Sequence, residues 1–202
     1  MANGKCTIGI TGGIGSGKSY VSAILAKELG VPVYDCDKEA KRLTALDEDI
    51  RRQLIKLVGP DVFNGTTLNK QCLADYLFAD TEHAKKVNAI VHPAVLKDFT
   101  LWAEKQDKPL VALESAILYE SGFCKYVDYV LFVDAPEGVR LQRAMQRDKA
   151  TEAQVRARMK MQQPEQHRGL ADFVIDNSTD KDIRIQEQLK RMVDTIKQTL
   201  HS

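Results

Sequence analysis

A short segment near the amino terminus, residues 12–19 with the sequence GGIGSGKS, constrains the fold of this 202-residue chain more than any other feature. It fits the pattern G-x-x-x-x-G-K-[ST] of a loop whose backbone N–H groups surround nucleotide phosphates. The preceding residues, TIGIT at 7–11, are typical of a buried strand, and residues 21–29 have the spacing of an amphipathic helix. Because this strand–loop–helix order is the context that the motif requires, we predict a phosphate loop. The alternative, a flexible Gly/Ser linker, would not lie between a buried strand and a helix.

Five short apolar runs predict the strands of one buried parallel sheet, at residues 6–11, 31–35, 110–114, 129–134 and 173–176. Nearly continuous hydrophobicity, with helical stretches between the runs, is typical of strands that are covered on both faces. The helical stretches carry their own signals, which include a capping box in TEAQ at residues 151–154 and an apolar stripe along residues 185–200. We therefore expect an α/β fold with three layers, αβα, around a five-stranded parallel sheet.

One stretch between predicted strands, residues 38–107, is far longer than a single crossover helix requires. It has the pattern of several helices, with turns at Gly59-Pro60-Asp61 and near Asn64-Gly65. His92-Pro93 interrupts its last helical stretch, so we expect two helices to meet there. An insertion of this length usually covers an acceptor site, and we predict a helical acceptor domain.

A second stretch, residues 137–170, is rich in arginine and strongly helical. It lies where a mobile lid over transferring phosphates would be expected. The remaining segments, residues 1–37, 108–136 and 171–202, then form the predicted nucleotide-binding core.

The overall charge is close to zero, with 29 Lys and Arg against 28 Asp and Glu. This balance argues against general binding of nucleic acid or of a membrane surface. The four cysteines are far apart and form no C-x-x-C pair, and no apolar run approaches membrane-spanning length. We expect no secretory signal, a cytoplasmic location, and a monomer or small homo-oligomer.

Two carboxylates, Asp35 and Asp37, directly follow the second predicted strand. In open α/β sheets ligands bind at the carboxyl ends of the strands, so these side chains should face the phosphate loop. A carboxylate there can accept a proton from an attacking hydroxyl group or orient that group. The alternative role is a helix N-cap, which we weigh mainly for Asp37. Asp35 is the better catalytic candidate because it is nearer the end of the strand.

Positive side chains recur at helical spacing after the fourth predicted strand. Arg140, Arg143 and Arg147 would line one side of a helix, and Arg168 could join them. Such a row can neutralise charge that develops on a transferring phosphoryl group, while Lys18 reaches the β- and γ-phosphates. The alternative is an ordinary solvated helix face.

Three further polar residues are candidates for substrate contacts. Glu114 ends the third predicted strand and could bind a Mg²⁺-bound water or an acceptor hydroxyl group, with helix capping as the alternative. His92 could contact an acceptor phosphate or a backbone carbonyl. Asn177 follows the last predicted strand, where it could bind an adenine edge or form a turn.

Together these segments resemble the dephospho-coenzyme A kinase family over nearly the whole chain. The likeness includes IGITGGIGSGKS at residues 8–19, the triplet Asp35-Cys36-Asp37 against the family's D-A-D, His92-Pro93, the arginine-rich QRAMQRD at residues 142–148, and VIDN at residues 174–177. The phosphate loop alone would not be specific. Its combination with D-x-D beginning sixteen residues after Ser19 is specific.

The resemblance implies ATP-dependent phosphorylation of the 3′-hydroxyl group of dephospho-coenzyme A, the last step of coenzyme A synthesis. It also implies a P-loop core like that of nucleoside monophosphate kinases, with a helical acceptor-binding insertion and a helical lid. By position, Asp35 would be the base or orienter, Arg143 and Arg147 would be lid arginines, His92 would belong to the acceptor domain, and Asn177 would lie near the adenine. The ATP phosphates would be held by six residues, of which the last also ligates Mg²⁺: Ile14, Gly15, Ser16, Gly17, Lys18 and Ser19.

The chain departs from the family pattern at three places. Tyr20 stands where the family usually has Thr, so a hydroxyl contact to the α-phosphate is lost or replaced by backbone N–H groups. Lys41 occupies an arginine position, with Arg42 beside it, and residues 114–120 replace the usual P-L-L-x-E. These differences affect the detailed substrate contacts more than the reaction.

Two other functions compete with this interpretation. The nearest is a small P-loop kinase for a nucleoside or nucleoside monophosphate, although the long insertion favours a larger acceptor with a tail. The second is a nucleotide-driven switch or motor. Guanine-specific switches need N-K-x-D, whereas the N-K in Asn69-Lys70-Gln71-Cys72 lacks the Asp, and a motor would normally be larger.

Overall fold

The computed structural model describes residues 5–162, 164–178 and 182–200. The chain forms two compact units. The sheet unit consists of Met1–Tyr34 and Gln106–Ser202, and the helical unit consists of Asp35–Lys105.

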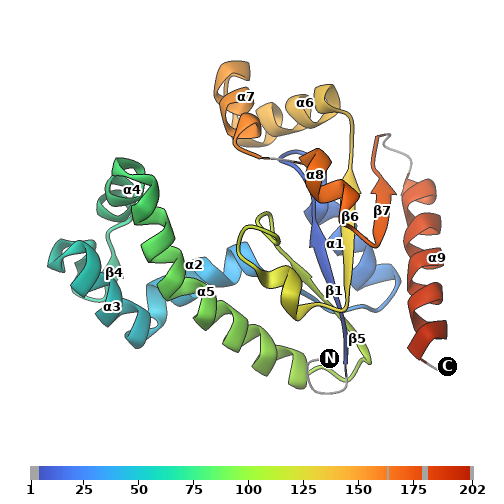
Figure 1. Cartoon of the computed structure of the whole chain (residues 1–202), viewed down its shortest axis with the longest axis horizontal. Helices are drawn as coiled ribbons and strands as arrows, with labels where there is room; N and C mark the ends of the chain where they lie inside the picture. The colour runs from blue at the N-terminus through green and yellow to red at the C-terminus, as the bar shows by residue number, and fades with distance from the viewer. Residues whose placement is uncertain (1–4, 163, 179–181, 201–202) are drawn as a thin grey trace. The chain divides into compact units, whose positions relative to one another are not determined.

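A five-stranded parallel sheet with the strand order β2-β5-β1-β6-β7 forms the centre of the sheet unit (Figure 1). Strand β1 pairs in parallel with β5 and β6, aligning Ile8 with Ala112 and Tyr129, and β6 pairs in parallel with β7. Four strands have the predicted bounds, and β2 begins two residues later than expected: Cys6–Thr11 (β1), Val33–Asp35 (β2), Leu110–Glu114 (β5), Tyr129–Asp134 (β6) and Phe173–Asp176 (β7). The predicted five-stranded parallel sheet is therefore confirmed.

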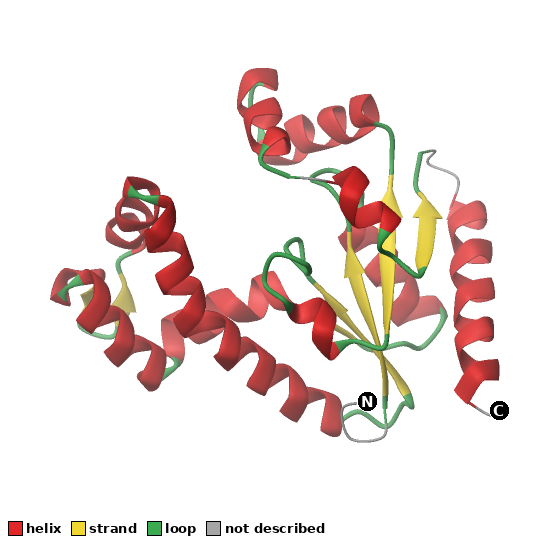
Figure 2. Ribbon diagram, in the orientation of Figure 1, coloured by secondary structure: helices red, strands yellow, loops and turns green. Residues whose placement is uncertain are grey.

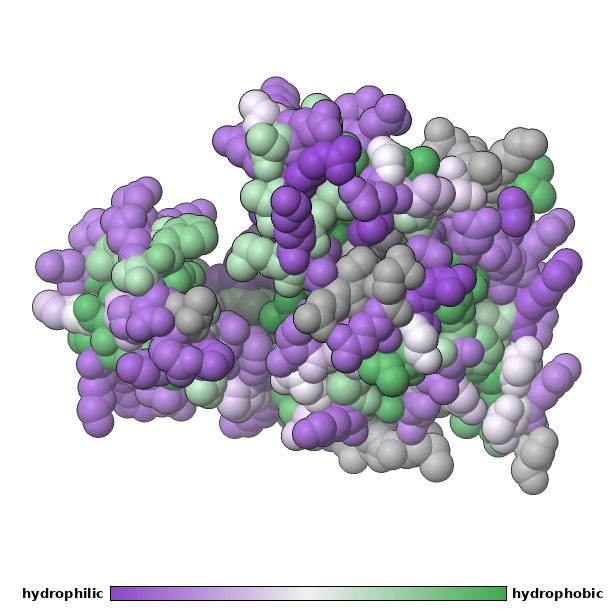
Figure 3. Space-filling model, turned by 45° about the horizontal axis from the view of Figure 1, so that its top comes forward, coloured by the Kyte–Doolittle hydropathy of each residue, from purple (hydrophilic) through white to green (hydrophobic). Residues whose placement is uncertain are grey.

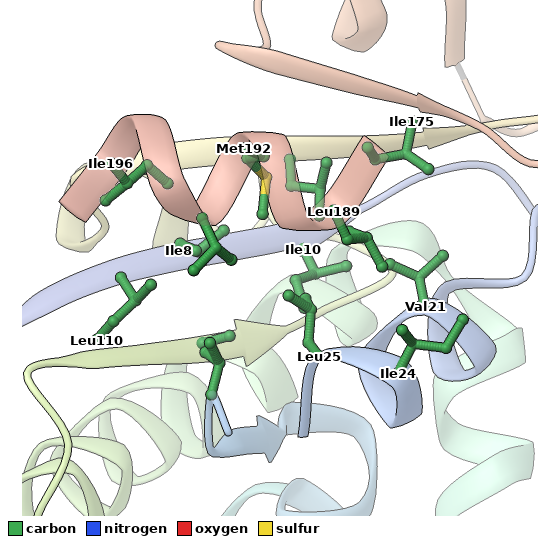
Figure 4. Packing of buried hydrophobic residues seen from close by; sticks show 14 of the residues in the cluster. Ile8, Ile10, Val21, Ile24, Leu25, Leu110, Ile175, Leu189, Met192 and Ile196 are labelled. Carbon is green, nitrogen blue, oxygen red and sulfur yellow. The ribbon is translucent and has the colours of Figure 1, made fainter. Parts of the chain in front are cut away.

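One face of this sheet is covered by α1 (Lys18–Glu28) and α9 (Asp182–Leu200). Alternate residues of β1 pack there with the apolar stripe of α9 and with α1, as Figure 4 shows for Ile8, Ile10 and Leu189. Ile8, Ile10 and Leu189 are fully buried. Burying a Leu or Ile side chain stabilises a fold by about 1.5–3 kcal/mol, so this cluster fixes both helices on the sheet.

The opposite face of the sheet is covered by shorter helical segments. Gly9 points to that face because its neighbours in β1 face α1 and α9, and a Cβ atom at Gly9 would meet Leu118 and Val127. The covering segment includes the 3₁₀ helix η2 (Phe123–Tyr126), and the adjoining α8 (Pro164–Gly169) contributes His167, which stacks on Tyr119. Helices thus cover both faces of the sheet, as predicted.

Helices α6 (Glu137–Asp148) and α7 (Glu152–Lys160) follow β6 and have a small apolar cluster of their own. Leu141, Ala144 and Val155 form its buried part, and Ile14 of the phosphate loop packs against them. Helix α7 starts with the predicted capping box, in which the side chain of Thr151 accepts from the backbone N–H of Gln154. We refer to residues 137–170 as the α6–α8 segment.

The helical unit contains four α-helices, a 3₁₀ helix and a small hairpin among the described residues (Figure 2). The turn predicted near Asn64-Gly65 joins the two short antiparallel strands of the hairpin, which the sequence analysis did not anticipate. The elements are α2 (Cys36–Leu46), α3 (Glu48–Val58), η1 (Pro60–Val62), β3 (Phe63–Asn64), β4 (Thr67–Leu68), α4 (Lys70–Ala79) and α5 (Thr81–Glu104).

The prediction that two helices meet at His92-Pro93 is wrong, because α5 continues through Pro93 as one helix of 24 residues. Pro93 is on the exposed side of α5. A stripe of residues on the other side is buried from end to end: Val87, Val91, Val95, Phe99 and Ala103. Proline inside a helix costs about 3 kcal/mol, whereas each large apolar side chain in the stripe contributes about 1.5–3 kcal/mol on burial. The continuous stripe therefore offsets the proline.

The visible surface is dominated by hydrophilic residues (Figure 3). Within the described residues, none of the helices has the length and hydropathy that crossing a membrane would demand.

Candidate active site

The phosphate loop, residues 12–19, connects β1 to α1 at the carboxyl end of β1. Its backbone is left-handed at two positions, with φ of 76° at Gly15 and 92° at Gly17, and Gly17 is the N-cap of α1. Left-handed residues interspersed among right-handed ones turn successive N–H groups toward one side and form an anion-binding concavity. Larger residues are excluded at both positions for a second reason. A Cβ atom at Gly15 would collide with the backbone of Arg140, and one at Gly17 with the side-chain amide of Asn177.

Hydrogen bonds within the loop hold this shape. The N–H of Ser16 donates to the carbonyl of Gly13 at 3.1 Å, and the ammonium group of Lys18 donates to the carbonyl of Gly12 at 3.0 Å. Across the described residues, the N–H groups of Gly15, Gly17 and Ser19 make no hydrogen bond to protein. These donors lie at the N-terminus of α1, where the helix dipole favours negative charge, so the loop can bind phosphate oxygens.

Ser19 and Glu114 form a polar pair beside the loop. The Ser19 hydroxyl donates to Oε1 of Glu114 at 2.9 Å, and Glu114 is 8% exposed at the end of β5. No cluster of three or more His, Cys, Asp or Glu side chains suited to a metal occurs among the described residues. Mg²⁺ is commonly held by one or two protein groups, several waters and substrate phosphates. The hydroxyl and carboxylate of this pair fit such a site.

Asp35 is the last residue of β2 and also the N-cap of α2. Its Oδ1 accepts from the backbone N–H of Lys38 at 2.9 Å, whereas Asp37 lies in the first turn of the helix. The cap that we weighed mainly for Asp37 is therefore made by Asp35. One carboxylate oxygen of Asp35 is fixed by this hydrogen bond.

The three arginines of α6 have different surroundings. Arg140 is buried against the phosphate loop, and Nη1 of Arg143 donates to the backbone carbonyl of Asn177 at 2.9 Å. Arg147 is exposed and pairs with Asp148, which raises the pKa of Arg147 and lowers that of Asp148. Arg168, on α8, donates to Asp134 at 2.9 Å. Arg143 is thus bonded to the core of the sheet unit, and Arg147 extends into solvent.

Asn177 braces the phosphate loop from the end of β7. Its side-chain amide donates to the carbonyl of Ser16 at 2.7 Å, its backbone N–H donates to the carbonyl of Asp134 at 2.8 Å, and it is 3% exposed. From the sequence we expected this amide near an adenine. The hydrogen bond to Ser16 gives Asn177 a role in positioning the loop that the sequence did not indicate.

His92 lies in the helical unit, half-buried within α5. Burial lowers the pKa of its imidazole. His92 therefore lies in the predicted acceptor region, and its burial favours the neutral form of the imidazole.

An open pocket adjoins the first half of the phosphate loop, between the loop, β6 and α8. The pocket is lined by residues from distant parts of the sheet unit: Thr11, Gly12, Gly13, Ala116, Glu120, Phe132, Gln162 and His167. Glu120, Gln162 and His167 line this pocket and are not among the residues predicted for the site. No motif marks them, because they come from three separate segments and only His167 lies on α8.

The phosphate loop, its lysine and the Ser19–Glu114 pair on this parallel sheet define a P-loop kinase. Over residues 6–182 the sequence also matches the family model described as dephospho-CoA kinase. The chain belongs to the dephospho-CoA kinase family.

Relatives and solved structures agree with this assignment. A protein named dephospho-CoA kinase from Bacteroides fragilis is 47% identical over 176 residues, which cover 86% of this chain and 85% of the relative. A crystal structure of a Thermus thermophilus protein superimposes with a TM-score of 0.82 at 34% identity, covering 95% of this chain and 97% of the other. A structure named dephospho-CoA kinase from Campylobacter jejuni has a TM-score of 0.68 at 22% identity, covers 96% and 98% of the two chains, and supports the fold.

Proposed function

We propose that the protein transfers the γ-phosphoryl group of ATP to the 3′-hydroxyl group of dephospho-CoA, which gives CoA and ADP. Family membership carries this assignment, and the phosphate loop supplies the donor site. We further propose that residues 38–107 bind the acceptor and that residues 137–170 act as a lid.

The donor phosphates would be bound by main-chain and side-chain donors of the loop. The unpaired N–H groups of Gly15, Gly17 and Ser19 lie at the start of α1, and Lys18 reaches the β- and γ-phosphates. Arg143 and Arg147 of α6 would add positive charge as the bond between the β,γ-bridging oxygen and the γ-phosphorus breaks. Together these groups would stabilise the transferring phosphoryl group electrostatically, which is the main requirement of phosphoryl transfer.

Ser19 and Glu114 would hold Mg²⁺, Ser19 through its hydroxyl and Glu114 through a bound water. When bound, the ion neutralises charge on the β- and γ-phosphate oxygens. The hydrogen bond between the two side chains fixes the Ser19 oxygen before the ion binds.

Asp35 would orient the 3′-hydroxyl group and accept its proton as the oxygen bonds to the γ-phosphorus. It ends β2, and the carboxyl ends of parallel strands are the expected place for bound ligands. The backbone of α2 already holds one of its oxygens. The other can face the acceptor.

The test is an ADP-release assay with dephospho-CoA, adenosine and AMP as alternative acceptors. We expect dephospho-CoA to be used far better than the other two, and equal or better use of AMP would favour a nucleoside monophosphate kinase. Asp35→Asn should lower turnover by roughly 10²-fold while ATP binding stays nearly intact, the scale of acid–base help. Asp194→Asn, an exposed site on α9, is the matched control. Unchanged turnover in Asp35→Asn would remove this residue from the mechanism.

A further inference from the structure

We infer that Gln162 is a further residue of the phosphoryl-transfer site, where its side-chain NH₂ group binds a non-bridging oxygen of the transferring phosphoryl group. This inference rests on the proposed function. It concerns a residue that no sequence motif marks.

The orientation of the Gln162 side chain is fixed by the phosphate loop. The backbone N–H of Ile14 donates to Oε1 of Gln162 at 2.8 Å. A backbone N–H can only donate, so the oxygen of the side-chain amide must face Ile14 and the NH₂ group must face away from it. The amide therefore presents two donors in a defined direction.

A second contact holds the same part of the chain against the loop. The side chain of Ile14 packs against the apolar cluster of α6 and α7, which includes Leu141 and Val155. Ile14 is thus bound to the α6–α8 segment by its backbone through Gln162 and by its side chain through this cluster. Two contacts of different chemistry at one loop residue restrict how Gln162 can move relative to the loop.

The transferring group is expected on the side of the loop that Gln162 faces. Gln162 lines the open pocket together with Gly12 and Gly13. The ammonium group of Lys18 contacts the carbonyls of these same two glycines, at 3.0 and 3.4 Å. Because this lysine binds β- and γ-phosphate oxygens in phosphate loops, the γ-phosphoryl group should border the pocket.

A neutral amide suits this position. It donates hydrogen bonds to developing negative charge, and it takes no proton from the hydroxyl group that Asp35 would deprotonate. Removing one preorganised donor from a charge-stabilising site lowers turnover by roughly 10²–10³-fold in enzymes where this has been tested. Gln162 is partly exposed, so substitution there should leave the fold intact.

Two variants of Gln162 and one control separate hydrogen-bond donation to the phosphoryl group from the hydrogen bond that holds the phosphate loop. Gln162→Glu keeps an oxygen for the N–H of Ile14 but replaces the NH₂ group with an anionic oxygen. Gln162→Met keeps the length of the side chain and removes both functions. Gln186→Glu, exposed on α9, introduces the same change of charge away from the pocket and from α6, and is the matched control.

Turnover with dephospho-CoA, KM for ATP and the melting temperature should be measured for each variant. We expect kcat to fall roughly 10²-fold in both Gln162 variants, with melting temperatures like the unmodified protein and with Gln186→Glu fully active. If Gln162 only braced the loop, Gln162→Glu would retain activity, so a kcat within threefold of the unmodified enzyme overturns the inference. An unmodified enzyme that is inactive on dephospho-CoA but active on another acceptor would instead overturn the proposed function.

Discussion

The hydrogen bond between Asn177 and Ser16 predicts a loss of stability when Asn177 is replaced, because this one side chain connects the end of β7 to the phosphate loop. Ser16 is fully buried and Asn177 is 3% exposed, with 2.7 Å between Nδ2 of Asn177 and the Ser16 carbonyl oxygen. Asn177→Ala leaves that carbonyl without its donor, which costs about 1–3 kcal/mol of unfolding free energy. For a protein of this size the melting temperature falls by about 2–4 °C per kcal/mol. The hydrogen bond from Arg143 survives, because it reaches the backbone carbonyl of Asn177.

The stability of an Asn177→Asp variant should depend on pH. The introduced carboxylate would place an oxygen against the Ser16 carbonyl, and burial would raise its pKa above the usual value of about 3.9. When folding raises the pKa of a carboxyl group, the folded protein becomes less stable as the pH rises toward the folded-state pKa of that group. We therefore expect Asn177→Asp to be more destabilised than Asn177→Ala at pH 8, and to recover part of its stability at pH 5.

Thermal unfolding at the two pH values, with and without ATP, measures these effects. ATP affinity should fall in both variants, because the Ser16 segment of the loop loses its brace. The exposed Gln146→Ala on α6 serves as the control and should melt like the unmodified protein. Asn177 does not brace the loop if Asn177→Ala lowers the unfolding free energy by less than about 0.5 kcal/mol, the range of ordinary surface substitutions, and leaves ATP affinity unchanged.

Two further predictions concern the core and the metal. Leu189→Ala removes a fully buried side chain of α9 and should lower the unfolding free energy by about 2–5 kcal/mol in denaturant titrations, whereas the exposed Leu101→Ala should lower it much less. Glu114→Gln keeps an acceptor for the Ser19 hydroxyl but loses the negative charge. It should raise the Mg²⁺ concentration for half-maximal activity by about 10–100-fold, the scale for lost outer ligands, and an unchanged Mg²⁺ titration would exclude Glu114 from the metal site.

The strands and the phosphate loop could be predicted because their signals are local. Continuous apolar runs and the G-x-x-x-x-G-K-[ST] spacing depend on neighbouring residues, and four of five strands have the predicted bounds. The continuity of α5 could not be predicted in this way. Proline at residue 93 is a strong local signal, and the buried stripe that outweighs it becomes evident only when the helix is packed.

Two contacts that could not be predicted from the sequence join distant parts of the chain. Gln162 is 148 residues from Ile14, and Asn177 is 161 residues from Ser16. Neither contact leaves a spacing or a periodicity in the sequence. The family resemblance indicated that Asn177 matters, but its hydrogen bond to Ser16 had to come from the structure.

Asp35 makes a helix cap in the structure and is also the residue for which we propose a catalytic role. A helix cap and a catalytic carboxylate were opposed interpretations of an aspartate after a strand, yet the cap uses one oxygen and fixes the direction of the other. The two roles can also be separated by experiment, because Asn caps helices about as well as Asp. Asp35→Asn should therefore preserve the start of α2 while removing the negative charge. A loss of turnover in this variant at unchanged melting temperature would belong to the chemistry of the carboxylate and not to the stability of the helix.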